Sequence, residues 1–74
     1  MGIVYSTEDL GLLIRSERKA QGYTQTELAE LANTSLSFLS NLENGKDSSE
    51  IGKALRIVAT LGIDLVAERR DEQA

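Results

Sequence analysis

The chain is 74 residues long and carries 8 basic and 12 acidic side chains, which give a formal net charge of −4 at pH 7. This length supports one small domain, and its core must be aliphatic because only three residues are aromatic. Cysteine and histidine are both absent, which excludes a disulfide framework, removes the usual ligands of a metal site and argues against an enzyme or a cofactor-dependent protein.

The first helix is expected to begin at Ser6 and to end at Gly22. Ser6 and Thr7 are capping residue types, while Glu8 and Asp9 place negative charge near the positive end of the helix dipole. The glycine supplies the stop. The residues before this helix, 1–5, are interpreted as an N-terminal extension. The apolar positions recur at helical spacing, at Leu10, Leu13 and Ile14.

The segment 24–46 has the pattern of two short helices joined by a tight turn. Thr24 and Glu27 have the spacing of a capping box, in which a hydroxyl and a carboxylate satisfy backbone N–H groups of the first turn. Asn33 falls where the chain must leave this helix, since asparagine tolerates a left-handed backbone. Ser35 can cap the second helix. A helix-turn-helix of this kind predicts duplex DNA as the ligand.

This segment resembles the Xre/Cro group of phage-repressor-like helix-turn-helix proteins, because it contains T-Q-x-E-L-A, a turn and L-E-N-G-K. The similarity covers about residues 10–62. In the family, the position of Gln25 opens the first motif helix and that of Ala29 lies at the close helix crossing. Asn33 stands where many members carry glycine, and Phe38 is a large apolar residue beside the expected reading face. The resemblance implies a phage-repressor-like domain of four helices.

Arg18 and Glu43 occupy positions at which the family makes a partly buried ion pair between the first helix and the end of the reading helix. The resemblance implies that pair here, the alternative being two unrelated surface charges. Removing one partner would then leave a buried charge uncompensated, at a cost of about 3–5 kcal/mol. Tyr23 is expected to pack its ring beneath the exit of the first helix, with base stacking as the alternative.

The net charge of −4 opposes a DNA-binding interpretation, since a phosphate-binding surface is expected to be positive. Its distribution is more favourable, because residues 31–42 contain no charged side chain and residues 63–74 account for a net charge of −2. Basic side chains follow the reading helix at Lys46, Lys53 and Arg56. We therefore expect a modest salt dependence of DNA binding. The alternative is that an acidic helix-turn-helix serves as a protein-binding module.

A fourth helix is expected between the capping residues 47–49 and Gly62, with Glu50 in its first turn. Gly52 lowers helix propensity by about 1 kcal/mol relative to alanine. Ile57 falls beside the main stripe and can extend an apolar surface toward a second subunit. The expected core stripe consists of Ile51, Ala54, Leu55, Val58 and Leu61.

Residues 63–69 alternate in polarity and include β-branched side chains, which predicts a short strand. A lone strand leaves backbone N–H and C=O groups unpaired, and no other segment offers a convincing mate. We therefore expect this strand to pair with the same strand of a second copy in a two-fold homodimer. The tail 70–74 is expected to be disordered. The residues assigned to the dimer strand are Ile63, Leu65, Val66 and Ala67.

A minimal domain at 6–62, followed by L-R-I-V-A-T-L-G-I-D-L and a dimer-forming strand, is similar to the HipB-type antitoxins. That resemblance implies a repressor that controls its own operon through a palindromic operator. It also implies a partner toxin related to HipA-type serine/threonine kinases. A stand-alone phage-type repressor without a toxin partner is the alternative. The expected fold class is all-α with a short C-terminal strand that pairs across a homodimer.

The outer side of the reading helix is expected to face base edges in the major groove. Asn41 is the best direct reader, because its amide can donate and accept in one plane, as adenine recognition requires. In a dimer two such helices lie about 34 Å apart, which predicts an inverted-repeat operator. The base contacts assigned are Leu36, Ser37, Ser40 and Asn41. The phosphate contacts assigned are Thr24, Gln25, Asn44, Lys46 and Lys53.

The chain contains no apolar run close to the roughly 20 residues that a membrane-spanning helix needs. Its amino terminus also lacks a basic segment leading into an apolar one. We therefore expect a cytoplasmic protein with double-stranded DNA as its partner and with no membrane, metal or cofactor.

Overall fold

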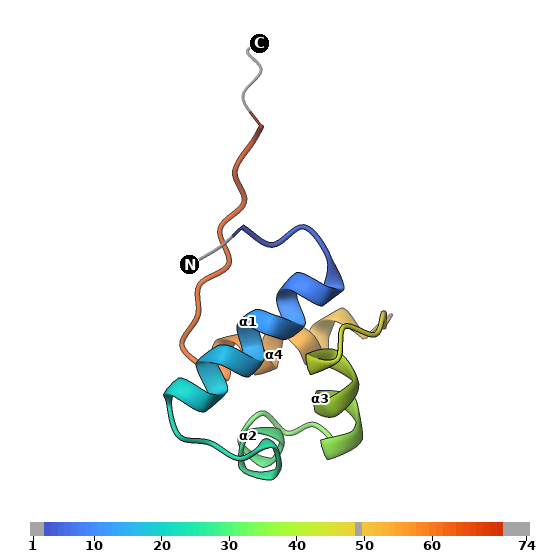
Figure 1. The fold of residues 1–74 in the computed structure, drawn as a ribbon, viewed down its shortest axis with the longest axis vertical. Helices are drawn as coiled ribbons and strands as arrows, with labels where there is room; N and C mark the ends of the chain where they lie inside the picture. Colours follow the sequence, from blue (N-terminus) through green and yellow to red (C-terminus); the bar gives the residue numbers. More distant parts are fainter. Residues whose placement is uncertain (1–2, 49, 71–74) are drawn as a thin grey trace.

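The computed structural model describes residues 3–48 and 50–70 of the chain. Within them it contains four helices and no strand (Figure 1). The helices are α1 (Thr7–Ala20), α2 (Gln25–Leu31), α3 (Leu36–Glu43) and α4 (Ile51–Thr60). The prediction of an all-α domain of four helices is therefore confirmed. The strand expected at 63–69 is absent from the single chain, because a β-ladder needs the N–H and C=O groups of a second strand.

Three of the four helices begin as the sequence predicts. Ser6, Thr24 and Ser35 are the N-caps of α1, α2 and α3, and each hydroxyl accepts a hydrogen bond from the backbone N–H three residues later. The fourth helix differs, since its N-cap is Glu50 and no side chain caps it. Asp47, expected as a cap, instead accepts a hydrogen bond at 2.8 Å from the hydroxyl of the first residue of α1.

The four described helices also end alike, at residues with a left-handed backbone. These residues are Gly22, Asn33, Gly45 and Gly62, with φ of 81°, 57°, 79° and 75°. After each, the next N–H reaches back to a carbonyl five residues earlier, and the N···O distances are 3.0, 2.9, 3.0 and 3.1 Å. This closure satisfies carbonyls that a helix end leaves without a partner. The stops predicted at these positions are therefore confirmed.

One side chain from each helix lies fully buried at the centre of the domain. These four are Ile14, Leu28, Leu39 and Ile57. Around them pack the remaining buried apolar residues, of which three also belong to α4 or its C-cap. The helices thus share one aliphatic core, as the shortage of aromatic residues predicts.

The position of α4 corrects two predictions about its faces. Ile57 is completely buried and does not extend a surface toward a second subunit, whereas Ile51 and Leu55, predicted for the core, are 63% and 47% exposed. The buried stripe contains Ala54, Ile57, Val58 and Leu61. It has the same helical spacing as the predicted stripe, so periodicity alone could not choose between the two rotations.

The two described ends of the chain lie at the same end of the molecule, away from α2 (Figure 1). The N–H of Tyr5 donates to Asp9 Oδ2 at 3.0 Å, which holds residues 3–5 near the start of α1. No helix in the described ranges is long and apolar enough to cross a bilayer, since even α1 has only 14 residues. The expected cap Ser49 and the tail beyond Arg70 lie outside the described residues.

Candidate nucleic-acid interface

The two motif helices, α2 and α3, are joined by a turn at 32–35. Both halves of the predicted capping box are present, because Thr24 N–H donates to Glu27 Oε1 at 2.8 Å and Glu27 N–H donates to Thr24 Oγ1 at 3.1 Å. Asn33 carries the turn with its φ of 57°, and the N–H of Thr34 donates to a carbonyl of α2 at 2.9 Å. Local chemistry therefore fixes the relative placement of the two helices.

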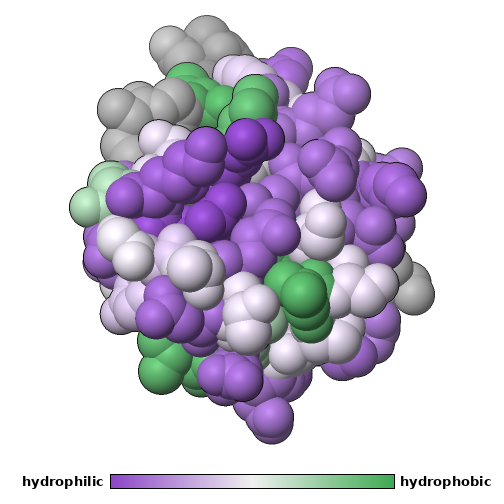
Figure 2. Space-filling view, turned by 60° about the horizontal axis from the view of Figure 1, so that its bottom comes forward, coloured by the Kyte–Doolittle hydropathy of each residue, from purple (hydrophilic) through white to green (hydrophobic). Residues whose placement is uncertain are grey.

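The α3 helix directs its apolar side inward and its polar side outward. Leu39 is completely buried, whereas Leu36, Ser37 and Asn41 are exposed and Ser40 is half-buried. Figure 2 brings forward the end of the molecule where α2 and the first turn of α3 lie, and it shows a mostly hydrophilic to neutral surface with separate small apolar patches. Three of the four side chains assigned to base edges are thus accessible to a ligand, and Ser40 less so.

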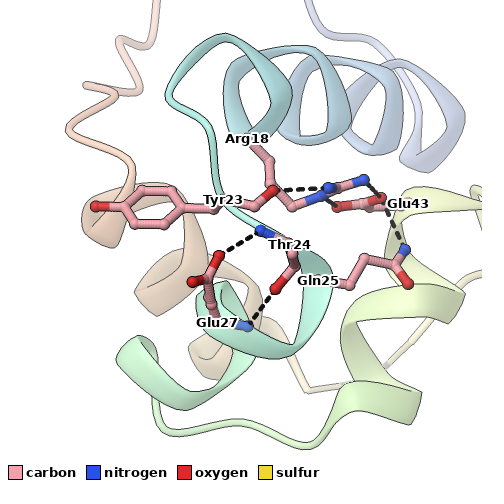
Figure 3. Close-up of polar contacts among 6 residues, drawn as sticks. All are labelled: Arg18, Tyr23, Thr24, Gln25, Glu27 and Glu43. Carbon is pink, nitrogen blue, oxygen red and sulfur yellow. Dashed lines mark hydrogen bonds and ion pairs between the residues drawn. The ribbon is translucent and has the colours of Figure 1, made fainter.

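A buried network holds the far end of α3 in place (Figure 3). Arg18 Nε donates to Glu43 Oε2 at 2.7 Å and Arg18 Nη2 donates to Glu43 Oε1 at 3.0 Å. Arg18 Nη1 donates to the carbonyl of Tyr23 at 2.9 Å. Gln25 Nε2 donates to Glu43 Oε1 at 2.9 Å. The end of α3 is therefore tied both to α1 and to the first residue of α2.

The ion pair also sets the charge state of Arg18. The hydrogen bond to Glu43 raises the pKa of Arg18, burial opposes this, and the attraction of the Glu43 carboxylate adds to the rise, so the pKa lies above its ordinary value. The guanidinium therefore remains charged at any pH at which the protein is handled. Each buried charge needs the other, because neither can be solvated where it lies.

Gln25 and Tyr23 flank this network. Gln25, predicted to contact a phosphate, commits one amide hydrogen to Glu43 and lies half-buried between the helices. Only its backbone N–H and the rest of its amide are left for a ligand. The Tyr23 ring points away from the network in Figure 3 and packs against the core, as predicted.

The basic side chains that follow the reading helix have different surroundings. Lys46 is exposed directly after the end of α3, as is Asn44. Lys53 Nζ lies 2.7 Å from Glu50 Oε1 and 5.6 Å from the centre of the Phe38 ring. Lys53 thus lies in an exposed ion pair, whereas Lys46 is exposed and forms no ion pair within the described residues.

Arg56 does not join these residues, contrary to the grouping that the sequence suggested. Its Nε donates to the carbonyl of Ala32 and its Nη2 donates to the carbonyl of Asn33, both at 3.1 Å. The side chain therefore satisfies carbonyls at the C-terminal end of α2, where a positive charge is also favoured by the helix dipole. These bonds join α4 to the turn of the motif.

A close contact between the backbones of α1 and α3 was not predicted from the sequence. A Cβ atom placed on Gly11 would lie 2.3 Å from the carbonyl oxygen of Leu42 and 2.9 Å from that of Glu43. The two backbones therefore approach at the last turn of α3, where only glycine fits. A glycine in the middle of a predicted helix was the available signal, since it needs a packing reason.

A family model described as Helix-turn-helix, HTH_3, matches residues 14–67. The chain belongs to the HTH_3 helix-turn-helix family. The matched residues include all of α2, α3 and α4 and the second half of α1. This membership confirms the Xre/Cro-type resemblance indicated by the residues of the two motif helices.

The HTH_3 chain is similar to a known regulator along most of its length. An uncharacterized HTH-type transcriptional regulator, y4mF of Sinorhizobium fredii (strain NBRC 101917 / NGR234), is 47% identical over 66 residues. The alignment covers 84% of this chain and 87% of that protein. The HTH_3 protein described here is accordingly an HTH-type DNA-binding transcriptional regulator and not an enzyme.

The fold of the HTH_3 chain is similar to the folds of two solved structures. The chain matched in the structure of a HipA-HipB-O2-O3 complex has a TM-score of 0.84 at 24% identity, and the superposition covers 96% of this chain and 100% of that one. The clp gene regulator ClgR from C. glutamicum has a TM-score of 0.71 at 32% identity, and the superposition covers 84% of this chain and 80% of that one. The first of these likenesses concerns the fold alone.

Proposed function

We propose that this protein is a transcriptional repressor that binds an inverted-repeat operator as a two-fold homodimer, with α3 in the major groove. The observation that carries the proposal is the outer face of α3, where Leu36, Ser37 and Asn41 are exposed while the Arg18–Glu43 pair holds the opposite side. A helix supported from behind presents its side chains at fixed positions. Base recognition requires this, because each contact depends on the register of the helix in the groove.

We assign sequence reading to the exposed side chains of α3. The Asn41 amide can donate to and accept from adenine in one plane, and Leu36 can contact a thymine methyl group. Ser37 can bond to more than one base. Ser40 has less freedom, because it is half-buried. Asn41 is therefore expected to carry the largest share of discrimination.

We assign positioning on the phosphates to residues at the edges of the motif. Asn44 and Lys46 follow α3 and are exposed, and Thr24 is exposed at the start of α2. Gln25 and Lys53 contribute only after giving up part of their contacts to Glu43 and Glu50. With so few cations available, the slope of log K against log salt is expected to be small, since each neutralised phosphate contributes about −0.9.

Selection from a randomised duplex library tests this proposal. The selected sequence is expected to be an inverted repeat with half-sites about 34 Å apart. Asn41→Ala should relax discrimination at one base pair by about 1–3 kcal/mol. Lys46→Ala should weaken all sites alike and make the salt slope less steep by about 1. Each variant is the control for the other. If Asn41→Ala binds the selected sites in the same order of affinity as the unmodified protein, Asn41 does not read the sequence.

A second candidate function is that of an antitoxin that also binds a HipA-like serine/threonine kinase. What favours it is the extent of the likeness to HipB, because a superposition over 96% of this chain reaches past α4 into the C-terminal segment. A pull-down from the native host, scored by mass spectrometry for a kinase-like protein, tests it. Failure to capture one, with no kinase-like reading frame beside the gene, would leave a stand-alone repressor of the phage type.

A further inference from the structure

Exposed apolar side chains gather where the two described ends of the chain meet. Residues 3–5 and 63–70 line a groove of about 680 Å³ beside α1. The Arg70 guanidinium lies 5.7 Å from the centre of the Tyr5 ring, so the two segments are neighbours. Ile3 and Val66 are 70% and 76% exposed within this terminal surface, which we define as residues 3–5 and 63–67. Exposed apolar side chains gathered in one place are a feature of interaction sites on small proteins.

The backbone of the C-terminal segment is unpaired as well. Ile63 N–H closes the end of α4, and its side chain packs against the core. Beyond it, no backbone hydrogen bond joins residues 64–70 to the rest of the described chain. In an extended segment, side chains alternate between faces, so Leu65 and Ala67 share the face of Ile63. The terminal surface therefore offers a free strand edge together with an apolar face.

We propose that a second copy covers the terminal surface by antiparallel pairing of residues 63–67 with the same residues of its partner, centred on Leu65. This inference rests on the homodimer of the proposed function and specifies its register. The block 63–67, apolar except for Asp64, is bounded by Gly62, whose left-handed backbone ends α4, and by the charged Glu68. The midpoint of the block is Leu65. Only a two-fold axis at Leu65 pairs every residue of 63–67 with a residue of 63–67 in the second copy.

Charge and polarity disfavour the two registers displaced toward the C-terminus, and a centre at Asp64 would place that carboxylate opposite its own counterpart. A centre at Val66 places Asp64 directly opposite Glu68 of the second copy, twice in each dimer, and like charges in opposed positions destabilise a strand pair. A centre at Ala67 places Leu65 opposite Arg69. A centre at Leu65 instead pairs Leu65 with its own counterpart and Ile63 with Ala67, so that the shared face is apolar throughout.

Single-cysteine variants test the register cleanly, because the chain has no cysteine of its own. In the proposed pairing, residue 65 directly faces its counterpart, at a Cβ separation of about 4.5–5.5 Å. Residues 66 and 67 lie too far from their counterparts, since a disulfide needs Cα atoms within about 7 Å. Mild oxidation at low protein concentration should therefore cross-link Leu65→Cys at least tenfold faster than Val66→Cys or Ala67→Cys. Mixing Asp64→Cys with Val66→Cys should give a cross-linked heterodimer.

Sedimentation of the unmodified chain separates a failure of the register from a failure of the dimer. A dimer whose Val66→Cys or Ala67→Cys variant cross-links fastest has a different register, and the inference is then wrong. A chain that sediments as a monomer at tens of micromolar overturns the proposed homodimer itself. If Leu65→Cys weakens association, the heterodimer of Asp64→Cys and Val66→Cys still reports the register, because those positions oppose each other only when the centre is Leu65.

Discussion

Substitution of Gly11 by alanine should destabilise the domain, although alanine is the better helix former. The new Cβ would lie 2.3 Å from the carbonyl oxygen of Leu42, whereas ordinary contacts begin at 3.4 Å, so the backbones must separate by about 1 Å. Both clashing atoms belong to the backbone of α3, and no side chain can rotate away. Overpacking of this kind costs about 1–3 kcal/mol or more, which exceeds the gain of about 1 kcal/mol in helix propensity.

Gly52 supplies the matched control, since the same substitution there meets nothing within 4 Å. Gly52→Ala should leave stability unchanged or raise it by about 0.5–1 kcal/mol. Urea and thermal unfolding, followed by circular dichroism, compare the two variants. A loss of 1 kcal/mol lowers the Tm of a domain of this size by about 4–8 °C. If Gly11→Ala proves as stable as Gly52→Ala, the close approach of α1 and α3 described here is wrong.

Two further predictions concern the buried pair and the turn. Arg18→Met should cost about 3–5 kcal/mol in urea unfolding, because Glu43 would keep only its bond from Gln25. The double variant Arg18→Met/Glu43→Leu should recover most of that loss, and failure to recover would mean that Arg18 acts mainly through its bond to the Tyr23 carbonyl. The raised pKa of Arg18 means that its stabilisation is complete below its ordinary pKa and is lost only at more alkaline pH, so the cost should be equal at pH 7 and pH 9. Asn33→Gly should be nearly neutral in thermal unfolding and Asn33→Ala should cost about 1–2 kcal/mol, because φ is +57°; equal Tm values for the two would contradict this.

The elements predicted correctly from the sequence are those fixed by neighbours along the chain. Ser6, Thr24 and Ser35 each bond to an N–H three residues away. The stops at Gly22 and Asn33 follow from the backbone conformations that these two residue types tolerate. Capping chemistry is local, so it can be read from the order of the residues without knowledge of the packing.

The features that sequence reasoning missed depend on contacts between distant segments. The buried face of α4 could not be chosen from its periodicity, because the stripe of Ile57 and that of Leu55 have the same spacing. Arg56 was grouped with the lysines predicted to lie along the DNA backbone, yet its partners are carbonyls 23 and 24 residues earlier in the chain. The C-terminal segment has no mate within the described residues, so the strand predicted there is not formed in a single chain.

The residues that hold α3 in place differ from the residues on its outer face that we propose to contact bases. Behind α3, the position of the helix is fixed by Gly11, by the Arg18–Glu43 pair and by the side chain of Gln25. None of these residues lies on the exposed outer face of α3, where Asn41 stands. Because the supports are buried or half-buried and the outer face is uncharged, side chains on that face can change without disturbing the core. If the proposed function holds, substitutions on that face are expected to change which operator is bound while the fold is kept.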